Sequence, residues 1–577
     1  MKTVTKTAQA VTVLLGASLV AAACGSSKSS SSSTTAAGAP TTAAATTSTT
    51  GGATTTTSGD NTGKPMTITV KLNPKAVWDD GTPITSKDFE CTWKAKLNTP
   101  GSIETSGYDQ ITAIDTTDPA TAVIKYKSVY APYKNLFNTI IKAAAVKNCD
   151  DISADFQDNL PFSGREWKLD SWSKDQAVLV PNTKFWDPAR TPKAKKLVMV
   201  PKADQDTEMN SLKSAEVDFI FPQAFAGITD TLKDANIKYT PGYGTNYEAV
   251  YFQQQNGPFK DAAFRSAFSK SVDRNLILKS IYEPALPGAP LLNCGLWVPT
   301  IGKWCDNTQF ANSYDPTGAA KILTDAGWKK DGSGMWVGAD GKVPTIRWMV
   351  NTGNKRREDT QALMIPELKK AGFNVVADNA DSATVFQKRL PALDYDLAMY
   401  ISTAQPDPTQ TSILSCDQIP TPANGNKGQN YTGWCNQAAT ALMVKSDQEL
   451  DVTKRIDEIH QIGKALVDDS VMLPLFQFPN IAAWRTDKLD GPIDADAGNY
   501  RAFNNNSYAW VPKSGDQITI GAEQWPDCIN PYTECSNSSW EVWTAEFPLL
   551  PAVWDTTATG DYVVTDLVAG DPVVKVG

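Results

Sequence analysis

Strand-like and helix-like patterns of apolar residues alternate along this chain, and they limit the folds that it can adopt. Residues Met66–Leu72 place apolar side chains at every second position, which is typical of a strand with one buried face. Between Ile456 and Val467 the apolar residues return every three or four positions, as in a helix that buries one face. A strand pattern at Leu197–Val200 and a helix pattern at Ala319–Ala326 repeat the alternation. We therefore expect an α/β fold rather than an all-α or all-β one.

The length and the net charge of the chain limit the functions that it can have. The chain has 577 residues, of which 41% are hydrophobic, and a prior of about 150 residues per domain predicts three or four units. Its formal net charge is -9 at pH 7. Because a nucleic-acid-binding surface needs clustered positive charge, we expect no nucleic acid among the partners.

The first residues have the features of an export signal. Lys2 and Lys6 precede an apolar run, Ala8–Val20, that is too short to span a bilayer comfortably. The small residues that follow lead to Cys24 and resemble the lipobox of bacterial lipoproteins, although Ala21 stands where that motif prefers Leu.

We expect residues 1–24 to be a lipoprotein signal peptide, with Cys24 as the acylated N-terminus that holds the protein on the outer face of the cell membrane. Ordinary signal cleavage beside an incidental cysteine is the alternative. Residues 25–64 are nearly all Ser, Thr, Ala and Gly, which predicts a disordered tether.

The remaining cysteines indicate an oxidising compartment. The simplest connectivity pairs neighbours in sequence order and joins Cys91 to Cys149, Cys294 to Cys305, Cys416 to Cys435, and Cys528 to Cys535. There is one histidine, His460, on a helical stretch, and there is no CxxC motif. Zinc binding and Ser-His-Asp catalysis therefore lack their residues, and we expect no metal and no cofactor.

A strand, a tight Asp-Gly turn and a capped helix follow one another in Leu72–Phe89. Thr85 or Ser86 is placed to cap the helix, and Asp88 lies in its first turn, where a negative charge is favourable. The string WDDGTPITSKDF in this stretch resembles the signature of solute-binding protein family 5, which serves peptide and nickel ABC importers. Further stretches resemble family motifs in the family's order, and they are Leu179–Trp186, Leu212–Asp218, Phe259–Arg274 and Leu368–Phe373. The resemblance extends from about Met66 to Gly577.

The tail of the chain, residues 517–577, has the sequence pattern expected at the start of a domain. Ile518 and Ile520 alternate as in a strand, and a loop at Asn530-Pro531 and a stretch at Asp561–Leu567 follow. In family 5 a first strand, a Pro-containing loop and a helix precede the signature block, whereas here only the tether does.

The resemblance therefore predicts a circular permutation. Residues 573–577 would run into residues 63–66, and residues 504–513 would join the family's usual C-terminus to its usual N-terminus. Domains tolerate this rearrangement where the natural termini are close and the new break falls in a surface loop. A tandem second copy that is cut short is the alternative, but no motif appears twice.

The resemblance also implies an architecture: an α/β, periplasmic-binding-protein-like type II clamp of the cluster C type, with two lobes plus an extra domain. The expected boundaries are 65–160 with 545–577 for the extra domain (family domain II), 161–250 with 487–544 for lobe I, and 251–486 for lobe II (family domain III).

By the same resemblance the chain is a monomeric, extracellular substrate-binding lipoprotein of an ABC importer. It would capture an oligopeptide or related solute in a closing cleft and deliver it to a membrane permease, without being an enzyme. A non-transport sensor or envelope-assembly protein that binds a glycan or glycolipid is the alternative. A secreted carbohydrate-active enzyme is a weaker one, because Asp79 and Asp80 are neighbours and would point to opposite faces of a strand.

One loop bears on the ligand. In the family's peptide binders a sequence of roughly GWxxDYxDP supplies an Asp that pairs with the ligand's ammonium group. The matching stretch here is Tyr400–Pro408, in which Asp407-Pro408 is retained but Ala404 takes the place of the ammonium partner. This favours a neutral ligand, such as a glycan, a modified peptide or a glycolipid headgroup.

We expect the ligand to contact polar and aromatic side chains on this loop, near a lobe crossover and on the tail. These are Tyr247, Tyr400, Ser402, Thr403, Gln405, Asn430, Tyr431, Glu534, Ser536, Asn537 and Trp540. Asn430 has an equal alternative as a turn residue. Arg356 and Arg357 could clamp a ligand carboxylate, although a solvated helix start is the preferred interpretation.

Overall fold

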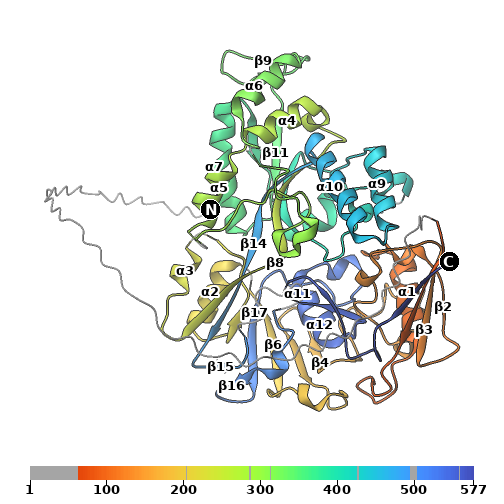
Figure 1. The fold of residues 1–577 in the computed structure, drawn as a ribbon. Helices are drawn as coiled ribbons and strands as arrows, with labels where there is room; N and C mark the ends of the chain where they lie inside the picture. Colours follow the sequence, from red (N-terminus) through yellow and green to blue (C-terminus); the bar gives the residue numbers. More distant parts are fainter. Residues whose placement is uncertain are drawn as a thin grey trace, which may run out of the picture. The chain divides into compact units, whose positions relative to one another are not determined.

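The computed structural model describes residues 63–577 except 203, 226, 285–286, 312, 425–427, 494–502 and 558. The expected signal peptide and Cys24 lie outside the described residues, as does the tether apart from its last two positions. The described part is a mixed α/β structure, as the alternating patterns predict (Figure 1). No helix in this part is both long and apolar enough to cross a membrane.

A mixed sheet of ten strands forms the centre of the described part. In spatial order its strands are β12 (Asn374–Ala377), β11 (Thr345–Met349), β13 (Leu397–Thr403), β8 (Ile237–Phe252), β14 (Met472–Arg485), β7 (Phe219–Ile220), β17 (Gln517–Ala522), β6 (Lys196–Pro201), β5 (Ala177–Pro181) and β4 (Trp167–Trp172). The long strands β8 and β14 pair antiparallel from Tyr251 with Met472 to Ile237 with Arg485. These two strands therefore run through both halves of the sheet and connect them.

Helices cover the half of the sheet that contains β11, β12 and β13. They are α4 (Ala262–Ser271), α5 (Arg274–Ile277), α6 (Pro316–Asp325) and α7 (Lys355–Ala371). Phe252, Phe264 and Phe268 belong to the buried core beneath them. A second group of helices, α8 (Thr411–Leu414), α9 (Gln437–Asp447) and α10 (Val452–Asp468), packs around a separate core that includes Trp434 and Leu466.

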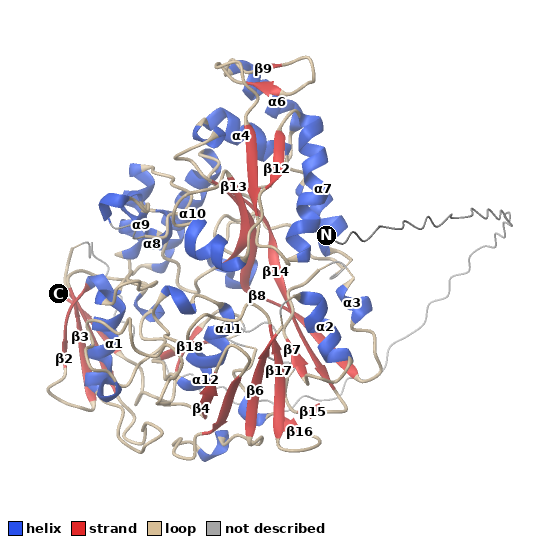
Figure 2. Ribbon diagram, turned by 180° about the vertical axis from the view of Figure 1, so that it is seen from behind, coloured by secondary structure: helices blue, strands red, loops and turns tan. Residues whose placement is uncertain are grey.

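In the other half, β17 lies between β6 and β7 and is parallel to both. Figure 2 shows α2 (Gln205–Lys213) beside β7 and β17, and α3 (Ile228–Thr231) lies on the same side. The short helices α11 (Ser539–Glu541) and α12 (Phe547–Leu549) follow in the tail. Ile518, Ile520 and Ala522 of β17 have no exposed surface, so this tail strand is a central part of the core.

A separate antiparallel sheet has the strand order β2 (Ile111–Asp115), β3 (Thr121–Tyr126), β1 (Met66–Lys71) and β20 (Val573–Val576). Helix α1 (Ser86–Asn98) packs on it. The helix begins with a capping box in which Thr85 and Asp88 bond each other's backbone amides, so the predicted cap is confirmed. Three two-stranded ribbons complete the set: β9 (Lys329–Lys330) with β10 (Trp336–Val337), β15 (Leu489–Asp490) with β16 (Val511–Pro512), and β18 (Trp554–Thr556) with β19 (Tyr562–Val564).

The end of the chain lies beside the start of the described part. In the β1–β20 pair Met66 is opposite Val576, and the backbone amide of Gly577 donates to the carbonyl of Pro65 at 2.9 Å. The two ends are therefore placed as the two arms of a β-hairpin that lacks its turn.

The four expected cysteine pairs are the disulfides of the structure, which confirms the nearest-neighbour connectivity. They are Cys91–Cys149, Cys294–Cys305, Cys416–Cys435 and Cys528–Cys535.

Candidate ligand-binding pocket

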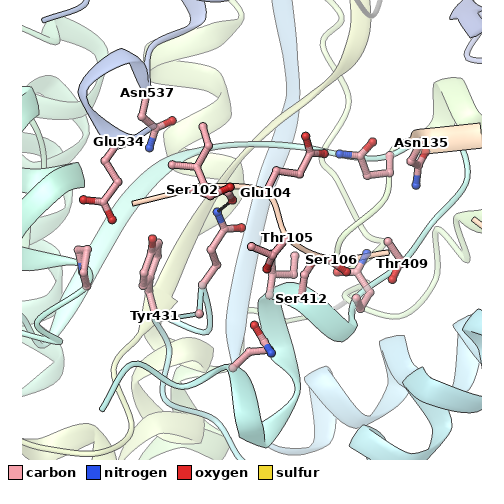
Figure 3. A pocket seen from close by; sticks show the side chains of 18 of the residues that line it. Ser102, Glu104, Thr105, Ser106, Asn135, Thr409, Ser412, Tyr431, Glu534 and Asn537 are labelled. Carbon is pink, nitrogen blue, oxygen red and sulfur yellow. Dashed lines mark hydrogen bonds between the residues drawn. The ribbon is translucent and has the colours of Figure 1, made fainter. Parts of the chain in front are cut away.

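A cavity of about 810 Å³ is lined mainly by three parts of the chain that are far apart in sequence (Figure 3). One wall is the loop after α1, residues 99–106, together with Asn135. A second wall runs from the end of β13 through α8 to the loop around Tyr431. The tail contributes Glu534 and Asn537.

Backbone hydrogen bonds join the tail to the loop after α1. The amide of Ile103 donates to the carbonyl of Tyr532 at 3.1 Å, and the amide of Glu534 donates to the carbonyl of Gly101 at 3.2 Å. Ser102 and Thr533 also form an antiparallel bridge. The tail loop is therefore held at a fixed place on the rim of the cavity.

The second wall is also bonded across the cavity to the first part of the chain. The side-chain amide of Gln429 donates to the carbonyl of Ile103 at 2.8 Å, and that of Asn135 donates to the carbonyl of Asp407, also at 2.8 Å. The backbone amide of Ala131 donates to the carbonyl of Asp447 at 2.7 Å. The structure therefore shows the walls in contact, with the cavity between them.

Hydroxyl and amide side chains dominate the lining. Examples on the walls are Ser102, Thr105, Ser106, Asn135, Thr409, Gln410, Ser412 and Gln429. Aromatic rings are fewer and are contributed by Tyr130, Tyr247, Phe386 and Tyr431. Such groups both donate and accept hydrogen bonds, as a polar solute with amide or hydroxyl groups requires.

Among the described residues, three carboxylates line the cavity. Glu104 is paired with Lys96 at 2.8 Å, and Asp417 accepts the Ser415 hydroxyl at 2.6 Å. Loss of water around Glu534 raises the pKa of this carboxyl above its ordinary value. Burial, with the nearby charge of Glu534, raises the pKa of Tyr431 to about 12.

Most of the residues expected to contact the ligand lie on the cavity wall. They are Tyr247, Ser402, Thr403, Gln405, Tyr431, Glu534 and Asn537. They come from β8, from β13 and its following loop, and from the tail, so the fold brings together segments that the sequence keeps apart.

The other expected contacts do not line this cavity. Tyr400 stacks on Tyr251 with 4.2 Å between ring centroids, and Ser536 donates its hydroxyl to the carbonyl of Thr533. Trp540 is 1% exposed and packs among other aromatic rings of the core. The side-chain amide of Asn430 is fully buried and donates to three backbone carbonyls, which matches its alternative interpretation as a residue that shapes a turn.

The sequence reasoning missed the wall formed by residues 99–106 and the residues Asn135, Thr409, Gln410 and Ser412. The loop GSIETS after α1 consists mainly of small polar residues, which is typical of any exposed turn. Its position beside the tail loop is what makes it a wall of the cavity.

The residue that replaces the ammonium partner is buried. Ala404 is 2% exposed, does not line the cavity and donates its backbone amide to Thr245. The retained Asp407 forms an ion pair with Arg455, whose guanidinium lies over the Trp304 ring. Asp407 therefore stabilises this loop.

The expectation of a solvated helix start at Arg356 and Arg357 is wrong. Arg356 has no exposed surface and Arg357 is 2% exposed. Both bind the carboxylate of Glu248 on β8, at 2.6 Å and 2.8 Å. Because their guanidinium groups are already paired, neither is placed to clamp a ligand carboxylate in the cavity.

Asp80 acts in a turn, and Asp79 binds a segment distant in sequence. Asp80 accepts the backbone amide of Thr82 at 3.0 Å, and Asp79 accepts that of Ser163 at 3.0 Å. Neither lines the cavity. They do not converge across a shared space, as the carboxylate pair of a glycosidase must.

Residues 53–418 match the model of the bacterial extracellular solute-binding proteins, family 5 Middle. The chain belongs to this family. Family 5 members are extracytoplasmic substrate-binding proteins that take up peptides or small ligands and work with ABC permease subunits, and as a class they are not enzymes. The predicted family is therefore confirmed.

Known family 5 proteins align with most of the chain. The oligopeptide-binding protein OppA of Bacillus subtilis (strain 168) is 24% identical over 482 residues, which cover 77% of this chain and 82% of OppA. The solved structure of AppA from Bacillus subtilis, in complex with a nonapeptide, has a TM-score of 0.67 and 20% identity and covers 78% of this chain and 87% of AppA. The solved structure of NikZ from Campylobacter jejuni, in complex with Ni(L-His), has a TM-score of 0.67 and 17% identity and covers 78% of this chain and 89% of NikZ. The predicted periplasmic-binding-protein-like fold is confirmed by these neighbours.

The disulfide Cys416–Cys435 closes the loop that carries Tyr431. Replacing both cysteines by Ser is expected to lower the free energy of unfolding by about 3 kcal/mol, because the bridge restricts a loop with a sequence separation of 19 in the unfolded chain. Urea unfolding of the wild type and the double variant measures this difference. Equal unfolding midpoints under non-reducing conditions would contradict it.

Proposed function

We propose that this protein captures an oligopeptide or related solute in the cavity described above and delivers it to an ABC permease. The observation that supports this most strongly is the cavity itself, whose walls carry hydroxyl and amide groups and are bonded to each other across it. Peptide groups each offer one donor and one acceptor, which such a lining can satisfy.

The proposed mechanism is closure of two lobes about the strands they share. Strands β8 and β14 continue through both halves of the central sheet, so bending there would separate the walls. A ligand shifts this equilibrium only if it binds the closed form more tightly than the open one. The hydrogen bonds of Gln429 and Asn135 across the cavity would form in the closed form alone.

An organic solute suits the described lining better than a bare metal ion. The structures named for AppA and NikZ hold a nonapeptide and Ni(L-His), so relatives take different ligands. In the described part of this chain no three His, Cys, Asp or Glu side chains come together in a way that could hold a metal.

We also propose that the chain is a circular permutant with the domain boundaries given above. The tail strand β17 lies inside the central sheet, and β20 pairs with β1 at the start of the described part. Both placements agree with a tail that supplies the first strand and loop of the family fold. The proposed attachment to the membrane through Cys24 concerns residues outside the described part.

Native mass spectrometry of the protein from residue 25 onward, purified from its own host, tests the proposed function. We expect a co-purifying peptide or related solute of defined mass, which is lost after unfolding and refolding in denaturant. A protein that emerges empty and gains no thermal stability from peptide pools would contradict the peptide-binding function. Stabilisation by glycan pools alone would favour the sensor or envelope-assembly alternative.

A further inference from the structure

The charge of the cavity lining restricts the ligand further. Among the described residues that line the cavity, the charged side chains are Glu104, Asp417 and Glu534, and no Lys, Arg or His is present. Lys427 lies in the neighbouring stretch 425–427, outside the described residues. The described lining therefore offers negative charge to a ligand and no positive partner for a ligand carboxylate.

Two of these carboxylates already have partners. Glu104 forms its ion pair with Lys96, which is 3% exposed and lies over the Tyr532 ring. Asp417 accepts the Ser415 hydroxyl at 2.6 Å and the side-chain amide of Gln418 at 3.3 Å. Lys96 therefore offsets the charge of Glu104, and Asp417 accepts two hydrogen bonds from residues of its own turn.

Glu534 differs from both. Within the described part of the chain, the carboxylate of Glu534 forms neither an ion pair nor a hydrogen bond, and it lies on the same side of the cavity as Tyr431 (Figure 3). Its side chain is exposed to the solvent of the cavity, and the partial loss of water around this carboxyl, which no partner offsets, raises its pKa. A positive group from a ligand would supply that partner.

The backbone of Glu534 is held in place. Its amide donates to the carbonyl of Gly101, and the disulfide Cys528–Cys535 closes the loop that contains it. Asn537 lines the cavity one turn further along and offers a neutral side-chain amide beside it. With its backbone fixed, only the side chain of Glu534 has to be ordered when it binds a counter-ion.

Building on the proposed function, we propose that Glu534 binds a cationic group of the solute, an ammonium or a guanidinium, so that the pocket selects cationic peptides over neutral or anionic ones. The sequence, in which Ala404 replaces the family's ammonium partner, favoured a neutral ligand instead. The negative charge comes from the tail rather than from the loop that contains Ala404. The hydroxyl and amide walls would bind the uncharged remainder of the solute.

Three pools of synthetic tetrapeptide amides, whose residues are uncharged apart from one Lys in the third pool, test this inference by calorimetric titration of the ligand-free protein. The first has a free amino terminus, the second is acetylated, and the third is acetylated and ends in Lys. We expect at least one cationic pool to bind roughly ten- to a hundredfold more tightly than the neutral pool, because a charge-assisted hydrogen bond contributes that much. The first and third pools show whether the cation comes from the peptide terminus or from a side chain.

Glu534→Gln keeps the shape of the side chain and should remove this preference. Asp417→Asn removes the same charge from the same cavity, and we expect it to weaken binding of the cationic pools by at most about fivefold, because Asp417 already has its partners. Equal binding of all three pools to the wild type, or a preference that persists in Glu534→Gln, would overturn the role of Glu534 and leave the proposed function standing. If no pool bound the wild type, both the proposed function and this inference would be overturned.

Discussion

Replacing Glu248 by Gln is expected to lower the free energy of unfolding by about 3–5 kcal/mol, because it leaves two buried guanidinium groups without their shared counter-ion. Glu248 has no exposed surface, and Arg356 and Arg357 bind its two oxygens at 2.6 Å and 2.8 Å. Urea unfolding followed by circular dichroism measures the change.

The matched control is Glu90→Gln. Glu90 pairs with Lys94 on the surface of α1 at 2.9 Å, and both side chains are about one-third exposed. An exposed pair of this kind contributes roughly 0.3–0.5 kcal/mol. If the two variants lost the same small amount of stability, water would have to reach the Glu248 cluster, and its buried character would be contradicted.

The Glu248 cluster also connects the two halves of the central sheet. Arg356 lies in the first turn of α7 in one half and donates at 3.1 Å to the carbonyl of Ala224 and to the side chain of Gln223, which follow β7 in the other half. Loss of the shared carboxylate should therefore loosen the position of one half against the other. We expect the Glu248→Gln variant to bind its ligand less tightly even where it remains folded.

The sequence predicted those features that depend on neighbouring residues. The alternating pattern at β1, the capping box at Thr85 and Asp88, and the four disulfides all follow from local spacing and residue type. The family motifs predicted the fold because each of them marks a local element in a fixed order.

Features that depend on distant partners were not predicted. Arg356 carries the charge of a surface residue, and its burial depends on Glu248, which lies 108 positions earlier in the chain. Trp540 was expected to contact ligand because aromatic rings can do so, yet a large apolar ring fills a core equally well, and here it packs against Phe503 and Trp543. Charge and aromatic character alone do not distinguish a binding role from a packing role.

Deleting residues 515–577 is expected to abolish folding of the whole described part. The deletion removes β17 from between β6 and β7 and exposes the cores that contact Ile518 and Ile520. It also removes β20 from the edge of β1 and one wall of the cavity. The combined loss should exceed the total stability of about 5–15 kcal/mol that is usual for a folded protein. Circular dichroism and a thermal melt measure the outcome.

A rearranged chain distinguishes a circular permutation from a tandem second copy that is cut short. In this variant residues 515–577 precede residue 63, so that the new bond joins Gly577 to Gly63 and new ends fall near Ser514. The antiparallel pairing of Val576 with Met66 places the joined residues where a hairpin turn belongs. We therefore expect this variant to fold, to melt cooperatively near the wild-type temperature and to retain the same co-purifying solute. If instead the truncated chain melted like the wild type, the tail would be a dispensable piece of a second domain, and its place inside the central sheet would be contradicted.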